Sequence, residues 1–233
     1  MRRAAIRGIQ IEAFENKKQL LQCIRPSIYI SIGGEAILNN SPEMQAITED
    51  YIPYADGEIA VLALKKAGFK NVTKIPGVEL WIDFLEARKN LKVAAVGSTP
   101  EVIQLFAQKF AQSFPQHTLV YFQDGFSIRE KLEELGEKIA LHQPDVVLLA
   151  LGQPRQEILA RDLYLKHRGI YFCLGGSFDV FTGKVDRAPQ IFISLKLEWL
   201  FRLLMQPWRL KRIWRLPFLA IQIKLGFEEI RRV

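Results

Sequence analysis

Two carboxylates, Asp56 and Glu58, follow the short apolar segment Tyr51–Ala55 and open a stretch with helical periodicity. A carboxylate beside a ligand cleft can act as the general base that takes a proton from an attacking hydroxyl group. A carboxylate at a helix entrance can instead serve as the N-cap of that helix. Asp56 is open to both interpretations. The pair matches a D-x-D metal motif only weakly, because no second carboxylate pair accompanies it.

A second candidate is Gly152-Gln153-Pro154-Arg155-Gln156-Glu157, which lies between an apolar run and a helical stretch. Glycine and proline shape a turn, and the free backbone N–H groups at the start of the next helix favour an anion. Arg155 adds a positive charge that suits phosphate. The segment has neither a G-K-[ST] nor a G-x-G-x-x-G pattern. It therefore indicates a phosphate or polar ligand without identifying it.

The third candidate is Gly175-Gly176-Ser177-Phe178-Asp179, which is followed by Gly183 and by Arg187-Ala188-Pro189. A double glycine lets the backbone approach a ligand closely. The Asp179 carboxylate can bind a sugar or ribose hydroxyl, or it can close an Asx-turn. None of the three candidates has the spacing of a metal site, so we expect neither a metal ion nor an organic cofactor.

Short apolar runs that alternate with helical stretches must position these candidates. Runs rich in β-branched and aromatic residues predict strands at Ile28–Ile32, Lys92–Val96, Leu119–Phe122, Val146–Leu151 and Ile170–Leu174. Helical periodicity predicts helices at Gly57–Ala67, Val78–Lys89, Pro100–Phe114, Ser127–His142 and Arg155–His167. This alternation predicts a Rossmann-like α/β fold with a mostly parallel sheet flanked by helices. Ligands bind at the carboxyl ends of such strands, where the glycine turns lie.

Charge divides the chain into two parts. A chain of 233 residues can bury one substantial core, and we expect an α/β domain over residues 1–195. Residues 196–233 form a basic, amphipathic, helical appendage. Nine basic and three acidic side chains give this appendage a charge of +6, nearly all of the formal net charge of +7. The basic surface is thus a property of the C-terminal segment.

The appendage also holds three of the four tryptophans, Trp199, Trp208 and Trp214, with arginines between them. It can be a terminal helix with a solvated basic face, or an interfacial element with aromatic rings at headgroup depth and arginines on anionic lipid. A nucleic-acid surface is the third alternative, since basic and aromatic residues also suit it. Its apolar residues are able to drive self-association.

The sequence contains no signal for secretion that we recognise. Arg7, Gln10 and Glu12 interrupt the N-terminal region before it reaches signal-peptide length. No stretch approaches the roughly 18 to 20 apolar residues that span a bilayer. Cys23 and Cys173 lie far apart and lack metal or redox spacing, which indicates a reducing compartment. We expect a cytoplasmic location.

Taken together, these blocks resemble the WecG/TagA/CpsF family of glycosyltransferases (glycosyltransferase family 26). The C-terminal signature of the family is similar to Gly175–Asp179, Gly183, Arg187-Ala188-Pro189, Leu197–Leu203, Gln206-Pro207, Arg209 and Arg212. Upstream, Ala55-Asp56-Gly57, Lys74–Leu80 and Gly152–Glu157 resemble further motifs in the family's order. The resemblance extends from about Ser31 to Arg215, and the number and spacing of its blocks make it specific.

The resemblance implies an inverting transfer of N-acetylmannosamine, its uronic acid or glucose from a UDP-sugar to a polyprenyl-diphosphate-linked acceptor in bacterial cell-surface polysaccharide synthesis. The aspartate matching Asp56 is the family's proposed base. The residues expected to contact the substrates are Ser31, Gly33, Lys74, Glu79, Gly152, Gln156, Gly175, Gly176, Asp179, Arg187, Arg202, Arg209 and Arg212. The appendage would then bind the anionic inner face of the cytoplasmic membrane, with nucleic acid excluded as a partner.

The sequence departs from the family pattern at several of these positions. Ser31-Ile32-Gly33 stands where the family has T-x-N, so an amide is lost at Gly33. Lys74 replaces an arginine, which keeps the charge but loses bidentate phosphate geometry. Glu79 and Arg155 replace aspartate and lysine. The departures leave the donor sugar open, and a non-catalytic nucleotide-binding scaffold for an envelope-assembly complex remains an alternative.

Overall fold

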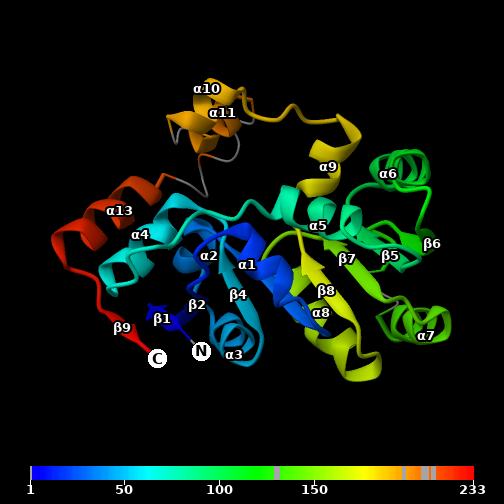
Figure 1. The fold of residues 1–233 in the computed structure, drawn as a ribbon, viewed down its shortest axis with the longest axis horizontal. Coiled ribbons are helices and arrows are strands. Elements are labelled where there is room, and N and C mark those ends of the chain that lie inside the picture. Colours follow the sequence, from blue (N-terminus) through cyan, green and yellow to red (C-terminus); the bar gives the residue numbers. More distant parts are fainter. Residues whose placement is uncertain (1, 129–131, 196–197, 206–209, 211–213) are drawn as a thin grey trace.

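A single mixed sheet organises the protein, as the computed structural model shows for residues 2–128, 132–195, 198–205, 210 and 214–233 (Figure 1). In the described residues the strand order is β6-β5-β7-β8-β3-β4-β2-β1-β9. The strands are β1 (Arg3–Ile6), β2 (Ile9–Glu12), β3 (Ser27–Ile32), β4 (Ile52–Ala55), β5 (Lys92–Gly97), β6 (Thr118–Gln123), β7 (Val146–Ala150), β8 (Ile170–Cys173) and β9 (Ile230–Arg232). The run from β6 to β2 is parallel, and β1 is antiparallel to both of its neighbours.

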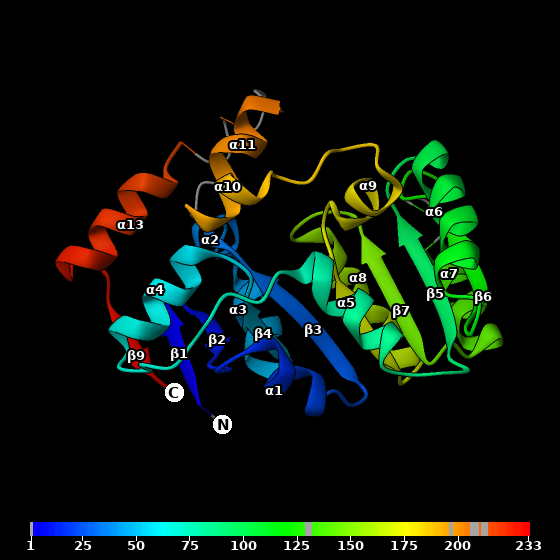
Figure 2. The same ribbon diagram turned by 45° about the horizontal axis from the view of Figure 1, so that its top comes forward.

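Helices cover both faces of this sheet (Figures 1 and 2). They are α1 (Lys17–Gln22), α2 (Gly34–Leu38), α3 (Pro42–Asp50), α4 (Glu58–Lys66), α5 (Gly77–Glu86), α6 (Pro100–Ser113), α7 (Leu132–His142), α8 (Arg155–Lys166), α9 (Ser177–Thr182), α10 (Gln190–Ser194), α11 (Glu198–Met205) and α13 (Leu216–Leu225). The five predicted strands and five predicted helices all have a counterpart here. The predicted α/β fold with a mostly parallel, helix-flanked sheet is confirmed.

The central strand β7 shows how the apolar pattern builds two cores. All five of its residues are buried. Val146 and Leu148 face the core formed with α5, α6 and α9, while Val147 and Leu149 face the core formed with α3, α7 and α8. Successive side chains of a strand point to opposite faces, so a strand covered on both faces must be apolar throughout. The continuous apolar run in the sequence has this physical cause.

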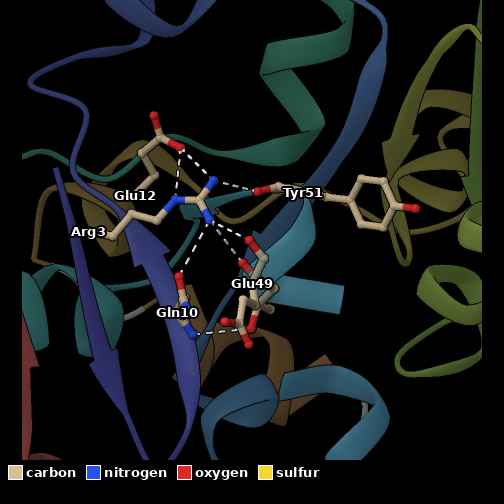
Figure 3. A network of polar contacts seen from close by, with 6 residues as sticks. Arg3, Gln10, Glu12, Glu49 and Tyr51 are labelled. Carbon is tan, nitrogen blue, oxygen red and sulfur yellow. Dashed lines mark hydrogen bonds and ion pairs between the residues drawn. The ribbon is translucent and has the colours of Figure 1, made fainter. Parts of the chain in front are cut away.

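Buried Arg3 fastens the N-terminal hairpin β1–β2 to the rest of the sheet (Figure 3). Its guanidinium group donates to the backbone oxygens of Glu49 at 2.8 Å and Tyr51 at 2.6 Å, at the C-terminal end of α3. It also pairs with the Glu12 carboxylate at 3.1 Å. The unpaired carbonyl groups at a helix C-terminus favour a positive charge. Arg3 thus joins β1, β2 and α3, none of which the sequence analysis predicted.

The end of the chain returns to this hairpin. Leu219 and Ile223 of α13 are buried against α4, and β9 pairs with β1 so that Ala5 lies opposite Arg231. Figure 1 accordingly places the two termini close together. The boundary at 195/196 stays a prediction, but the part of the appendage from Leu216 onward packs on the α/β sheet.

Helices α10 and α11 precede this returning segment and pack against each other, with the Phe192 and Phe201 rings 5.4 Å apart. Both ribbon views place them beyond the carboxyl ends of the parallel strands (Figures 1 and 2). The first part of the appendage therefore lies on the side of the molecule where the glycine turns emerge.

Candidate functional site

The candidate residues meet at one edge of the sheet because the strands that precede them are parallel neighbours. Strand β3 lies between β4 and β8, and β8 lies next to β7. Each of these strands is followed by a candidate residue: β3 by Gly33, β4 by Asp56, β7 by Gly152 and β8 by Gly175. The backbone N–H of Asp56 donates to the Ile32 carbonyl oxygen at 3.0 Å, which continues the pairing of β3 and β4 past their ends. The prediction that the glycine turns lie at the carboxyl ends of the strands is correct, whereas the strand before Asp56 was not predicted.

Asp56 does not cap α4. Gly57 occupies the N-cap position of that helix, and no side chain among the described residues caps it. The Asp56 carboxylate instead lies beside Gly77, the first residue of α5: a Cβ atom on Gly77 would stand 3.2 Å from Asp56 Oδ2 and 2.9 Å from Tyr54 Oη. The same position would be 3.6 Å from Cβ of Ser31. The interpretation of Asp56 as a helix cap is therefore wrong.

A backbone hydrogen bond explains how α5 comes so close to Asp56. The N–H of Ile75 donates to the Ala55 carbonyl oxygen at 2.8 Å, which holds the segment before α5 against the end of β4. Lys74 precedes this contact and is half-buried. The absence of a side chain at Gly77 then lets the helix start pack directly on the strand end.

The hydroxyl group of Tyr54 lies in the same place and is fully buried. It makes no hydrogen bond of normal geometry with any of the described residues. Burial, followed by the negative charge of Asp56, raises the pKa of Tyr54 well above its ordinary value, so the phenol keeps its proton. A neutral donor thus stands next to the carboxylate that is the candidate base.

Ser31 links this carboxylate region to the turns after β7 and β8. Its hydroxyl donates to the Cys173 carbonyl oxygen at 3.3 Å, and its own carbonyl oxygen accepts from Gln153 Nε2 at 2.8 Å. Gln153 therefore bridges β3 and the turn that begins at Gly152. Residues 31, 56 and 152–157, which are far apart in the sequence, belong to one continuous site.

Gln156 holds the glycine turn after β8. Its side chain is fully buried, and its Oε1 accepts a hydrogen bond from the Gly175 backbone N–H at 2.9 Å. Its Nε2 donates to Glu157 Oε1, also at 2.9 Å. Gly175 has a φ of +58°, a left-handed conformation that favours glycine. Gln156 thus stabilises the Gly175 turn from the buried side of the site. Its direct contact with a substrate stays a prediction.

Three glycines at this edge leave their backbone open. No described atom lies within 4 Å of the position that a Cβ would take at Gly33, Gly152 or Gly175. At Gly176 the nearest described atom is Asp179 Oδ2, at 3.9 Å. A ligand can therefore approach the backbone of neighbouring strand ends without meeting a side chain.

Asp179, in the first turn of α9, borders the same turn. Burial raises the pKa of its carboxyl group, and a hydrogen bond from Ser98 acts in the opposite direction. Ser98 follows β5 in a left-handed conformation with a φ of +58°, which is unusual for a residue other than glycine. The contact between Ser98 and Asp179 was not predicted from the sequence, because the two segments meet only in the folded sheet.

Glu79 and Arg187, two predicted substrate-binding residues, pair with each other. Lys17 of α1 also reaches Glu79, at 2.8 Å, and Asp83, at 2.5 Å. Burial raises the pKa of Glu79, but the hydrogen bonds from Lys17 and Arg187 outweigh it and the net shift is downward. Lys17 was not among the site residues predicted from the sequence. This ion-pair cluster joins α1 and α5 to the segment that leads from α9 to α10.

The three appendage arginines among the predicted site residues are not placed relative to this edge. The side chain of Arg202 in α11, and the residues Arg209 and Arg212, lie outside the part of the chain that is described. Within the described ranges, no group of three or more His, Cys, Asp or Glu side chains is arranged to hold a metal ion.

Two hollows formed by described residues lie away from the strand ends, beside Arg7 of the β1–β2 turn. One, of about 200 Å³, is lined by Arg7, Glu228 and neighbouring residues. The other, of about 250 Å³, is mostly apolar and includes Trp214 and Phe218. Neither hollow is lined by a candidate residue, so the candidate site is identified by its side chains and open glycines.

A comparison with known protein families agrees with this arrangement. A family model described as "Glycosyl transferase WecG/TagA/CpsF family" matches residues 10–230. The match covers nearly the whole chain, including the ends of β3, β4, β7 and β8 and the appendage as far as residue 230.

Proposed function

Because the chain belongs to the WecG/TagA/CpsF family of glycosyl transferases, we propose that it transfers a sugar from a UDP-sugar to a polyprenyl-diphosphate-linked acceptor. The sugar is N-acetylmannosamine, its uronic acid or glucose, and the product serves bacterial cell-surface polysaccharide synthesis. The observation that carries this proposal is the position of Asp56, which does not cap α4 but lies beside Ser31, Tyr54 and Gly77 at the edge of open glycine turns.

The reaction is a single displacement with inversion at the anomeric carbon. The acceptor hydroxyl oxygen forms the new bond to that carbon while the bond to the UDP oxygen breaks, and UDP leaves with the electron pair. Asp56 takes the proton of the acceptor hydroxyl as general base. The neighbouring Tyr54 hydroxyl keeps its proton, so it adds no negative charge that would repel the Asp56 carboxylate.

The donor diphosphate lies against the glycine turns in this proposal. Helix α8 begins at Arg155 directly after the turn at Gly152, whose backbone is open among the described residues. Unpaired N–H groups at a helix start attract an anion, and an exposed arginine adds charge. Asp179 and the backbone of Gly175 and Gly176 are suited to sugar or ribose hydroxyl groups.

We further propose that the transfer needs no metal ion. UDP leaves with developing negative charge, and arginine side chains and helix starts can stabilise it. We assign stabilisation of the leaving UDP to Lys74 and to three arginines of the appendage, Arg202, Arg209 and Arg212. Docking of the appendage would complete the site and exclude water from the donor.

Contact with the cytoplasmic face of the membrane is the proposed role of the appendage surface. Four apolar side chains of the appendage are exposed: those of Trp214, Phe218, Ile221 and Leu225. Two basic side chains beside them, Arg215 and Lys224, are exposed as well. Aromatic and basic side chains together favour an anionic lipid surface. No helix in the described part of the chain is long and apolar enough to cross a membrane. The same apolar surface can support self-association away from lipid.

The test is the release of UDP from a panel of UDP-sugars, with a short-chain prenyl-diphosphate-GlcNAc acceptor and with or without anionic vesicles. Acceptor-dependent release from one donor, increased by vesicles, is the expected result. UDP binding without release from any donor would replace the proposal by the scaffold alternative. Binding to oligonucleotides that falls steeply with salt, and no preference for vesicles, would favour a nucleic-acid partner.

A further inference from the structure

The carboxyl group of Glu157 has no assigned role, although it is fully buried in the first turn of α8. Pro154 occupies the N-cap position of this helix, and no side-chain cap is found among the described residues. The Glu157 Oε2 atom has no hydrogen-bond partner in the part of the chain that is described. Burial of a carboxyl group with one unsatisfied oxygen is costly, so its retention calls for a compensating role.

The contacts of Glu157 point to its neighbour Gln156. A glutamine amide has a donor end and an acceptor end of nearly equal shape, and its partners decide which end points where. Glu157 Oε1 accepts from Gln156 Nε2 at 2.9 Å. This contact occupies the donor end and directs Gln156 Oε1 toward the Gly175 N–H, also 2.9 Å away.

The reversed amide would not fit these partners. It would turn the Gln156 NH₂ group toward the Gly175 N–H, so that two donors faced each other, and an ionised Glu157 would also meet the Gln156 oxygen with a second acceptor. The backbone of Gly175 therefore keeps its partner only while Glu157 keeps an acceptor in place. The turn at Gly175 is left-handed, and no described side chain covers its other side. Its conformation therefore depends on the hydrogen bond from the Gly175 N–H to the buried Gln156 side chain.

We propose that Glu157 is a positioning residue, which orients the Gln156 amide and thereby fixes the Gly175 turn against which the donor nucleotide-sugar binds. The assignment of the turn to the donor rests on the proposed function, whereas the relay from Glu157 through Gln156 to Gly175 does not. Glu157 itself does not touch the substrate, because its side chain is fully buried.

The relay needs an acceptor oxygen and not a negative charge. Burial raises the pKa of Glu157, which favours the protonated carboxyl group, and the hydrogen bond from Gln156 opposes this shift only in part. A protonated carboxyl group still offers its carbonyl oxygen as an acceptor. The isosteric amide in Glu157→Gln offers the same oxygen, whereas Glu157→Leu removes it and keeps a similar volume.

The experiment compares hydrogen exchange of the Gly175 amide, and UDP affinity, in the full-length wild type, Glu157→Gln and Glu157→Leu. Leu163→Ala is the matched control, because Leu163 is buried farther along α8 and touches the same core. We expect Glu157→Leu to lose about tenfold in Gly175 protection and in UDP affinity, the size of one hydrogen bond. We expect Glu157→Gln to stay within about twofold of the wild type, since it keeps the acceptor.

Loss of Gly175 protection in Leu163→Ala equal to that in Glu157→Leu would overturn the proposal, because it would reflect general destabilisation. Failure of Glu157→Gln to restore protection would also overturn it. If Glu157→Leu does not fold, the wild type alone decides: the side-chain NH₂ of Gln156 and the Gly175 N–H must both exchange slowly, and rapid exchange of either contradicts the relay. Intact protection without UDP binding would instead contradict the proposed function.

Discussion

Gly77 approaches Asp56 so closely that a methyl group on Gly77 would lie 3.2 Å from the Asp56 Oδ2 atom. The start of α5 and the end of β4 therefore form one wall of the candidate site. A side chain at Gly77 would press on the two groups that the proposed reaction uses together, the Asp56 carboxylate and the Tyr54 hydroxyl.

Gly77→Ala should consequently lower turnover more than stability. The new Cβ would stand 2.9 Å from Tyr54 Oη, and both side chains would have to move. We expect kcat to fall about tenfold or more, with a loss of roughly 1 kcal/mol in the free energy of unfolding. Gly136→Ala in α7 is the control, because its Cβ meets the flexible end of Lys166 in α8. Equal activity in the two variants would contradict the close packing at Asp56.

Removal of the Arg3 side chain should destabilise the protein without changing the chemistry. Arg3→Met would leave Glu12 and the end of α3 without their partner, and we expect a loss of about 3 kcal/mol in the free energy of unfolding, measured with urea. Arg2→Met, which breaks an exposed pair with Glu15 and a contact of the guanidinium with the Phe69 ring, should cost about 1 kcal/mol. Similar losses in both variants would show that the Arg3 network does not fasten the hairpin.

The stability of the wild type should fall with rising pH relative to that of Glu157→Gln. The pKa of Glu157 is raised above 4.5 in the folded protein, so the folded state holds a proton that the unfolded chain releases. The contribution of this proton to the free energy of unfolding is complete below pH 4.5. It decreases as the pH rises from 4.5 through the pKa of Glu157 in the folded protein. Cys173 interacts electrostatically with Glu157, and burial raises the pKa of Cys173, so its thiol stays neutral in this range.

Urea unfolding of both proteins between pH 4.5 and 8 measures this difference. The stability of Glu157→Gln minus that of the wild type should increase across the range. A difference that stays constant with pH would mean that Glu157 titrates at its ordinary pKa.

Replacement of the outer apolar residues of α13 should reduce membrane binding and leave the fold intact. Phe218, Ile221 and Leu225 are exposed, whereas Leu219 and Ile223 of the same helix are buried. The combined change to serine at the three exposed positions should weaken sedimentation with anionic vesicles at least tenfold, since each apolar side chain contributes about 1 to 2 kcal/mol on burial. Leu141→Ser, an exposed leucine in α7, is the control. Unchanged sedimentation would remove this surface from the membrane contact.

The sequence was most informative where the local pattern and the fold agree. β7 is apolar at successive positions because both of its faces are covered, and the glycine turns mark the strand ends. β1, β2, β4 and β9 were missed, because each has only three or four residues and is stabilised by pairing with segments far away in the chain. Such pairing leaves little periodicity in a short window.

Contacts between segments far apart in the chain also explain which site residues the sequence predicted and which it did not. Asp56, Gly152 and Gly175 occur in local motifs, whereas Lys17, Tyr54 and Ser98 gain their contacts only when distant segments meet. Tyr54 reads as one more apolar residue in Tyr51–Ala55, and only the fold puts its hydroxyl beside Asp56. The ambiguity between a base and a helix cap at Asp56 likewise needed the structure, which places Gly57 at the cap.

The most direct test of the account is the turnover of Asp56→Asn with the donor found in the UDP-sugar panel. The amide keeps the size of the side chain and cannot accept the proton of the acceptor hydroxyl, so kcat should fall at least a hundredfold while UDP affinity changes little. Asp162→Asn, in the exposed part of α8, is the matched control and should retain full activity. Near-normal turnover of Asp56→Asn would contradict the assignment of Asp56 as the base.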